Sequence, residues 1–68
     1  MKNLIQYTAW VYVPDSENQE NFDVEGLVEV TYETEEVLKA KVTRHIADKN
    51  RCEFNHVTHL EIEKIESI

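Results

Sequence analysis

The first apolar run of the chain has no Gly or Pro and is rich in β-branched and aromatic residues, which predicts a strand over residues 3–13. Alternate residues of this strand put Ile5 and Val11 on one face and Leu4, Trp10 and Tyr12 on the other. Both faces carry apolar residues, so we expect the strand to be covered on both sides, at least toward its C-terminal end.

A second strand is predicted over residues 22–33, after a polar loop over 14–21 that is rich in turn-forming residues. Its apolar residues alternate with acidic ones, which is typical of a strand with one face in the core and one in water. Gly26 lies inside this pattern and is interpreted as a candidate β-bulge.

A helix is predicted over residues 34–48, with Thr34 as the N-cap. Leu38, Val42 and Ile46 recur every four residues and form the expected inward stripe. The predicted opposite side of the helix carries small residues where long charged ones are more usual. These are Ala40, Thr43 and Ala47.

The last segment fits two structures, because its apolar positions follow neither period cleanly. Phe54, Leu60 and Ile62 share strand parity, whereas Val57 and Ile65 break it. We favour a strand over residues 56–64 because its residues are strand-like, with a helix as the alternative. The prediction is therefore one α+β domain over residues 1–68, in the order β-β-α-β, with one helix packed on a small, mostly antiparallel sheet.

The charge of the chain is large for its size and is unevenly distributed. There are 14 acidic residues against 7 Lys and Arg, giving a formal net charge of −7 over 68 residues. Residues 14–36 are acidic with no Lys or Arg, whereas most of the basic residues lie in 37–51. This balance disfavours direct nucleic-acid binding, which needs a basic surface, and favours a basic protein partner.

The acidic strand and the start of the helix are the first candidate site. Like-facing residues on a strand are about 6.6 Å apart, so a row of carboxylates could imitate a nucleic-acid backbone and occupy a basic protein surface. The alternative is an ordinary solvated strand face. The candidate residues are Asp23, Glu25, Glu29, Glu33, Glu35 and Glu36.

Two further candidates concern assembly and metal binding. The aromatic face with Trp10 and Tyr12 predicts self-association or partner contact, with the stripe of small helix residues as a second contact. Cys52, His56 and His59 have zinc-ligand chemistry, but in a strand His56 and His59 face opposite sides. We therefore expect no metal and no other cofactor.

No pattern in the chain predicts catalysis or a membrane span. A single glycine leaves no phosphate-binding loop, nucleophile elbow or dinucleotide motif. No apolar run approaches the length of a membrane span, and a single cysteine fits a reducing compartment, so a cytoplasmic protein is expected.

The leading functional hypothesis is a small acidic protein-binding module that blocks a basic surface, as phage-type inhibitors and nucleic-acid mimics do. The alternative is a homo-oligomeric structural or accessory module without catalytic activity. The third hypothesis is a small zinc-stabilised module.

Overall fold

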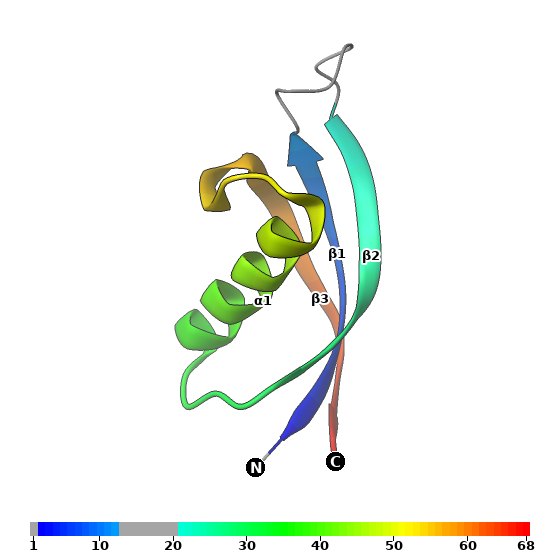
Figure 1. Ribbon diagram of the computed structural model, residues 1–68. Coiled ribbons are helices and arrows are strands. Elements are labelled where there is room, and N and C mark those ends of the chain that lie inside the picture. Colours follow the sequence, from blue (N-terminus) through cyan, green and yellow to red (C-terminus); the bar gives the residue numbers. More distant parts are fainter. Residues whose placement is uncertain (1, 13–20) are drawn as a thin grey trace.

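A computed structural model describes residues 2–12 and 21–68 of the chain. Strand β1 spans Asn3–Tyr12, β2 Asn21–Val30 and β3 Val57–Ser67, and helix α1 spans Glu35–Asn50 (Figure 1). A short 3₁₀ helix, η1, covers Phe54–His56 and leads into β3. The predicted α+β class and β-β-α-β order are confirmed, whereas residues 13–20, with most of the predicted loop, lie outside the described residues.

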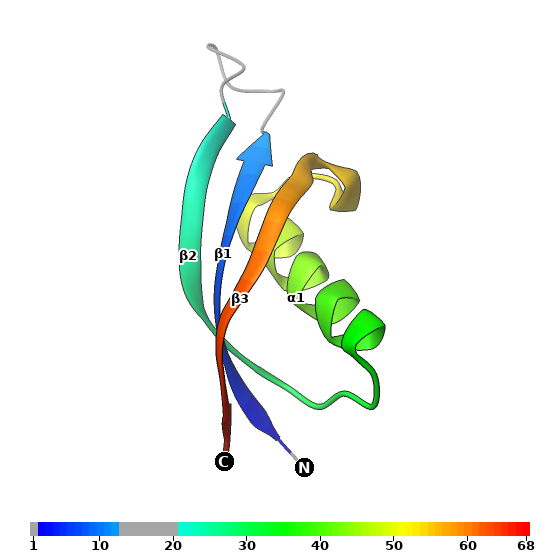
Figure 2. The ribbon, with the colours of Figure 1, turned by 180° about the vertical axis from the view of Figure 1, so that it is seen from behind.

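The three strands form one antiparallel sheet in the order β2-β1-β3, with β1 in the middle. Helix α1 lies against one side of this sheet (Figure 1), which we call the covered face. Figure 2 shows the sheet from the opposite side, where no described element crosses it. We call this second side the open face.

The core lies between the covered face and the helix. On β1 the buried side chains are the odd-numbered ones, which the alternation of the sequence placed on one face. The sequence predicted cover on both faces, whereas the described elements cover this face alone. Because β1 is the central strand, these side chains pack at the centre of the core. They meet the inward stripe of α1, and the main buried apolar residues are Ile5, Tyr7, Ala9, Val11, Leu38, Val42 and Ile46.

Helix α1 begins where the sequence predicted and ends two residues later. The Thr34 hydroxyl accepts a hydrogen bond from the Val37 backbone N–H at 3.2 Å, so Thr34 is the N-cap. Arg51 closes the other end in the left-handed conformation, with φ of 55°. Its backbone N–H turns back to carbonyls of the last turn, which satisfies groups that the helix leaves unpaired.

The predicted outward stripe of small helix residues is wrong at two of its three positions. Thr43 and Ala47 are buried, whereas Ala40 is exposed. The helix therefore buries a broad face against the sheet, and small residues at 43 and 47 allow the close approach. Thr43 and Ala47 are not accessible for an oligomer contact.

Two features predicted for the second strand are also wrong. The strand ends at Val30 and not at residue 33, so Glu33 lies beyond it. Gly26 forms no bulge, because the pairing of β1 with β2 runs without a register shift from Asn3↔Val30 to Tyr12↔Asn21.

The irregular pairing lies instead in β3, and it explains the broken parity of the last segment. Register shifts occur between Gln6 and Tyr7 and between Thr8 and Trp10 of β1. Each shift adds residues to β3 and resets which side chains face the helix. As a result Val57, Leu60, Ile62 and Ile65, which follow no single period, all lie on the covered side of the strand.

The predicted strand at the C-terminal end is thus confirmed, and it extends to Ser67. Among the described residues, no helix has the length and apolar character needed to cross a membrane.

Candidate protein-docking face

The open face is built from the even-numbered residues of β1 and the residues paired with them. Leu4, Gln6, Thr8, Trp10 and Tyr12 alternate with the buried side chains of β1. Directly opposite residues in a sheet share a face, so the register assigns the neighbours on β2 and β3 to the same side. Helix α1 packs on the other side, so no described element covers the open face.

Acidic side chains dominate the open face. Asp23, Glu25 and Glu29 come from β2, while Glu61 and Glu66 come from β3. Glu63 joins them, because its carboxylate accepts a hydrogen bond from the Thr8 hydroxyl at 3.1 Å. The register puts one cation there, Lys64, whose ammonium lies 3.9 Å from the Glu66 carboxylate.

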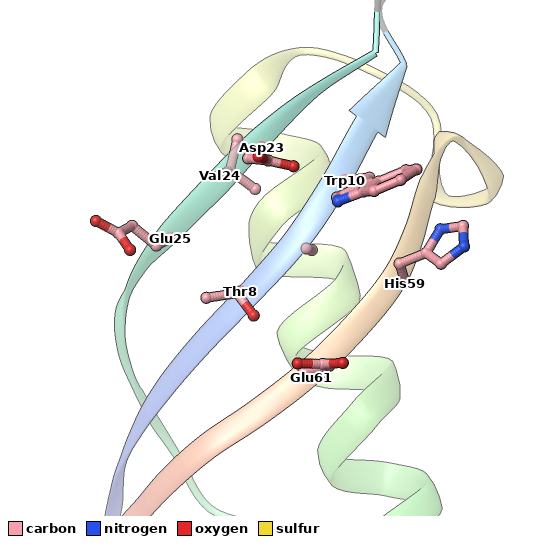
Figure 3. A pocket seen from close by; sticks show the side chains of 8 residues that line it. Thr8, Trp10, Asp23, Val24, Glu25, His59 and Glu61 are labelled. Carbon is pink, nitrogen blue, oxygen red and sulfur yellow. The ribbon is translucent and has the colours of Figure 1, made fainter.

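Three of these acids, Asp23, Glu25 and Glu61, line a groove that spans all three strands of the open face, which we call the acidic groove (Figure 3). Its volume is about 550 Å³. Thr8 lies in its middle, paired with Glu25 on one side and Glu61 on the other. The lining residues are Thr8, Ala9, Trp10, Asp23, Val24, Glu25, His59 and Glu61.

Trp10 supplies the main apolar surface of the acidic groove. Its ring lies against the ring of His59, with centroids 4.4 Å apart and planes tilted by 37° (Figure 3). His59 reaches this position from the irregular part of β3, with φ of 53°. This contact still leaves 48% of the Trp10 surface exposed.

The chemistry of the acidic groove suits a cationic side chain. Carboxylates on two strands flank an indole ring, and the face of such a ring attracts Arg and Lys. Arg also forms paired hydrogen bonds with carboxylates through its planar guanidinium group. A small anion, in contrast, would be repelled by every charged group that lines the groove.

The structure divides the six predicted acidic-site residues into two groups. Asp23, Glu25 and Glu29 lie together on the open face, as predicted. Glu33 follows the end of β2, and Glu35 and Glu36 lie in the first turn of α1. The last two acids lie near the helix N-terminus, where negative charge stabilises the helix.

The residues proposed for metal binding are also separated. His59 contacts Trp10, while the His56 ring meets Tyr12 edge-on at 5.4 Å, and Cys52 packs beside the core. Burial raises the pKa of the Cys52 thiol, which disfavours the thiolate that zinc requires. Within residues 2–12 and 21–68, no three His, Cys, Asp or Glu residues are grouped to hold a metal ion.

Sequence reasoning did not include the β3 acids Glu61, Glu63 and Glu66 in the candidate site, nor Leu27 of β2. Glu61 becomes a neighbour of the β2 acids only because β1 lies between β2 and β3, an order that the sequence pattern does not specify. Leu27 lies opposite Gln6 and is 59% exposed, so the acidic face also has a protruding apolar side chain. The sequence contained a signal for this apolar side chain, because Leu27 has the same strand parity as Glu25 and Glu29.

Comparison with known proteins gives no relative for this chain. No protein-family model, curated protein or solved structure matches it.

Proposed function

We propose that this protein is a small binding module whose open face docks on a basic surface of a partner protein and blocks that surface. The observation that carries the proposal is the open face itself, where six carboxylates and one lysine share one side of the sheet with a half-exposed tryptophan. A partner that normally binds nucleic acid has the complementary chemistry. The proposal includes binding and competition and no catalytic step.

Electrostatics supports a charged partner because the acids are concentrated on one face. Complementary potentials speed up diffusional encounter and select against partners with the wrong charge. The same attraction weakens as salt is added, since exposed charges are screened over a Debye length of about 8 Å at physiological ionic strength. Binding through this face should therefore be strongly salt-dependent.

Trp10 supports a specific contact in addition to the diffuse field. Tryptophan is enriched among the residues that dominate binding energy at protein interfaces. A partner Arg or Lys entering the acidic groove would contact the indole ring with its apolar stem and the carboxylates with its charged head. We therefore expect one basic side chain of the partner to contact Trp10, Glu25 and Glu61.

The alternative function is a homo-oligomeric module, which is favoured by the exposure of Trp10 and Leu27 on the open face. A symmetric dimer through this face would bring two sets of carboxylates together, and like charges across an interface are costly. The charge of the open face therefore favours a basic partner over a face-to-face dimer.

The test compares three baits in affinity capture from the native host. The open-face variant combines Asp23→Asn, Glu25→Gln and Glu61→Gln. The helix-start variant combines Glu33→Gln, Glu35→Gln and Glu36→Gln, and it removes the same number of charges. We expect wild type and the helix-start variant to retain a basic protein that the open-face variant loses.

Salt and competition complete the test. The retained protein should be released when the salt is raised, and it should lose bound nucleic acid when this module is added. If all three baits capture the same proteins, the open face has no docking role and the proposed function is wrong. Circular dichroism of each bait confirms that the comparison is made between folded proteins.

A further inference from the structure

A second groove lies on the outer side of α1, away from the open face. Its lining combines apolar side chains with two cations, and its volume is about 580 Å³. Val37 and Phe54 are 39% and 48% exposed there, so the groove offers apolar contact surface beside its two cations. We call this site the helix groove, and its lining residues are Val37, Ala40, Lys41, Arg44 and Phe54.

The charges of the helix groove are opposite to those of the open face. Lys41 donates a hydrogen bond to the Thr31 carbonyl, a neutral acceptor that leaves its positive charge uncompensated. Arg44 forms no ion pair with any residue that the structure describes. The described ion pair on the helix joins Lys39 to Glu35, so the two cations of the groove are free to meet carboxylates from outside.

From this charge complementarity we infer that the helix groove of one copy receives the open face of a second copy. The open face offers carboxylates together with the exposed apolar side chains of Trp10 and Leu27. The helix groove offers Lys41 and Arg44 together with Phe54. The two surfaces are therefore opposite in charge, and both offer exposed apolar side chains to the contact.

The contact is heterologous, because its two surfaces are different parts of the same chain. After the first contact forms, one copy keeps a free open face and the other keeps a free helix groove, so the assembly extends head to tail. The net charge of −7 on every copy opposes growth and keeps the association weak. A basic partner would compete for the same open face and dissolve the assembly, so this inference goes beyond the proposed function but shares its surface.

Two charge-reversal variants test the contact. Arg44→Glu reverses one charge of the helix groove and leaves the open face intact. Glu25→Lys reverses one charge of the open face and leaves the helix groove intact. In sedimentation, the association of wild type should increase with protein concentration up to about 1 mM, which is the range of dissociation constants for weak contacts. Each variant alone should associate at least about tenfold more weakly than wild type, because like charges now meet across the contact.

Mixing the two variants gives the decisive measurement. The intact open face of Arg44→Glu fits the intact groove of Glu25→Lys, so an equimolar mixture should form a one-to-one dimer that cannot extend. A symmetric dimer through the open face would instead persist in Arg44→Glu alone. Such persistence, or a mixture that stays monomeric, would overturn the inference.

Matched controls change the same charges elsewhere. Lys49→Glu lies on α1 outside the groove, and Glu33→Lys lies off the open face. Both should associate as wild type does, and equal loss in the controls would show that net charge governs association. A wild type that stays monomeric throughout would also overturn the inference, and binding of a glutamate-rich peptide to its groove would then indicate an external acidic partner.

The outcome is separable from that of the proposed function. Arg44→Glu keeps the complete open face, so it should capture the basic partner as wild type does. Loss of self-association with partner capture intact supports the head-to-tail contact, whereas loss of capture in the open-face variant alone bears on the proposed function.

Discussion

The single glycine of the chain has a steric role in the core. Gly26 lies directly opposite Tyr7, whose side chain is almost completely buried. A Cβ at position 26 would lie 2.7 Å from the Tyr7 hydroxyl oxygen and 3.1 Å from the ring carbon that bears it. The glycine therefore makes room for the ring, and burial in this position raises the pKa of the Tyr7 hydroxyl.

This contact predicts a coupling between two substitutions. Gly26→Ala should lower the free energy of unfolding by about 1–3 kcal/mol, because a rigid, buried ring must shift. In a Tyr7→Phe background the cost should fall, since the nearest atom is gone. Urea unfolding of wild type, the two single variants and the double variant measures the coupling. Equal costs of Gly26→Ala in both backgrounds would show that the Tyr7 hydroxyl is not what excludes a side chain.

At the scale of elements, the predictions from sequence are correct where local chemistry determines the structure. They are wrong or ambiguous where the pairing of strands determines it. Thr34 and the stripe of Leu38, Val42 and Ile46 predicted the helix, because capping and periodicity act within the element itself. Gly26 was misread as a bulge because a glycine in a strand also marks a close approach of another group. The bulges of β3 left only a broken parity at Val57 and Ile65, which is ambiguous until the partner strand is known.

Helix α1 yields a prediction that separates its exposed and buried alanines. Ala47→Gln should lower the free energy of unfolding by about 2–4 kcal/mol, because it places a polar side chain in a filled core. Ala40→Gln should change it by less than about 0.5 kcal/mol, as exposed substitutions usually do. Thermal unfolding followed by circular dichroism checks both.

This pair has the same chemical change at two positions on one helix, so helix propensity cancels between them. If Ala40→Gln proved as costly as Ala47→Gln, the orientation of α1 on the sheet would be wrong. The sequence had assigned both alanines to one outward face, and only packing against a broad sheet surface distinguishes them.

At the scale of the whole molecule, the helix covers one face of the three-stranded sheet, and within residues 2–12 and 21–68 no element covers the other. The two-sided apolar pattern of residues 3–13 predicted that β1 needs contacts on both faces, and the structure describes cover on one. Three of the six acids of the open face, Asp23, Glu25 and Glu29, were found from strand alternation alone. The other three, Glu61, Glu63 and Glu66 on β3, needed the order of strands, which short-range patterns do not contain.

The crowded acids of the open face predict that salt stabilises the folded protein. Six carboxylates lie on neighbouring positions of one face in the folded state, and they separate when the chain unfolds. Screening this repulsion should raise the free energy of unfolding by about 1 kcal/mol between low salt and 0.5 M NaCl.

For the same reason, the open-face variant should be at least as stable as wild type at low salt and should gain less from added salt. Thermal unfolding across a salt series measures both effects, and the helix-start variant, with equal net charge, should keep most of the salt response. A wild type that salt does not stabilise, or equal responses in the two variants, would mean that the open face stores no repulsion of its own.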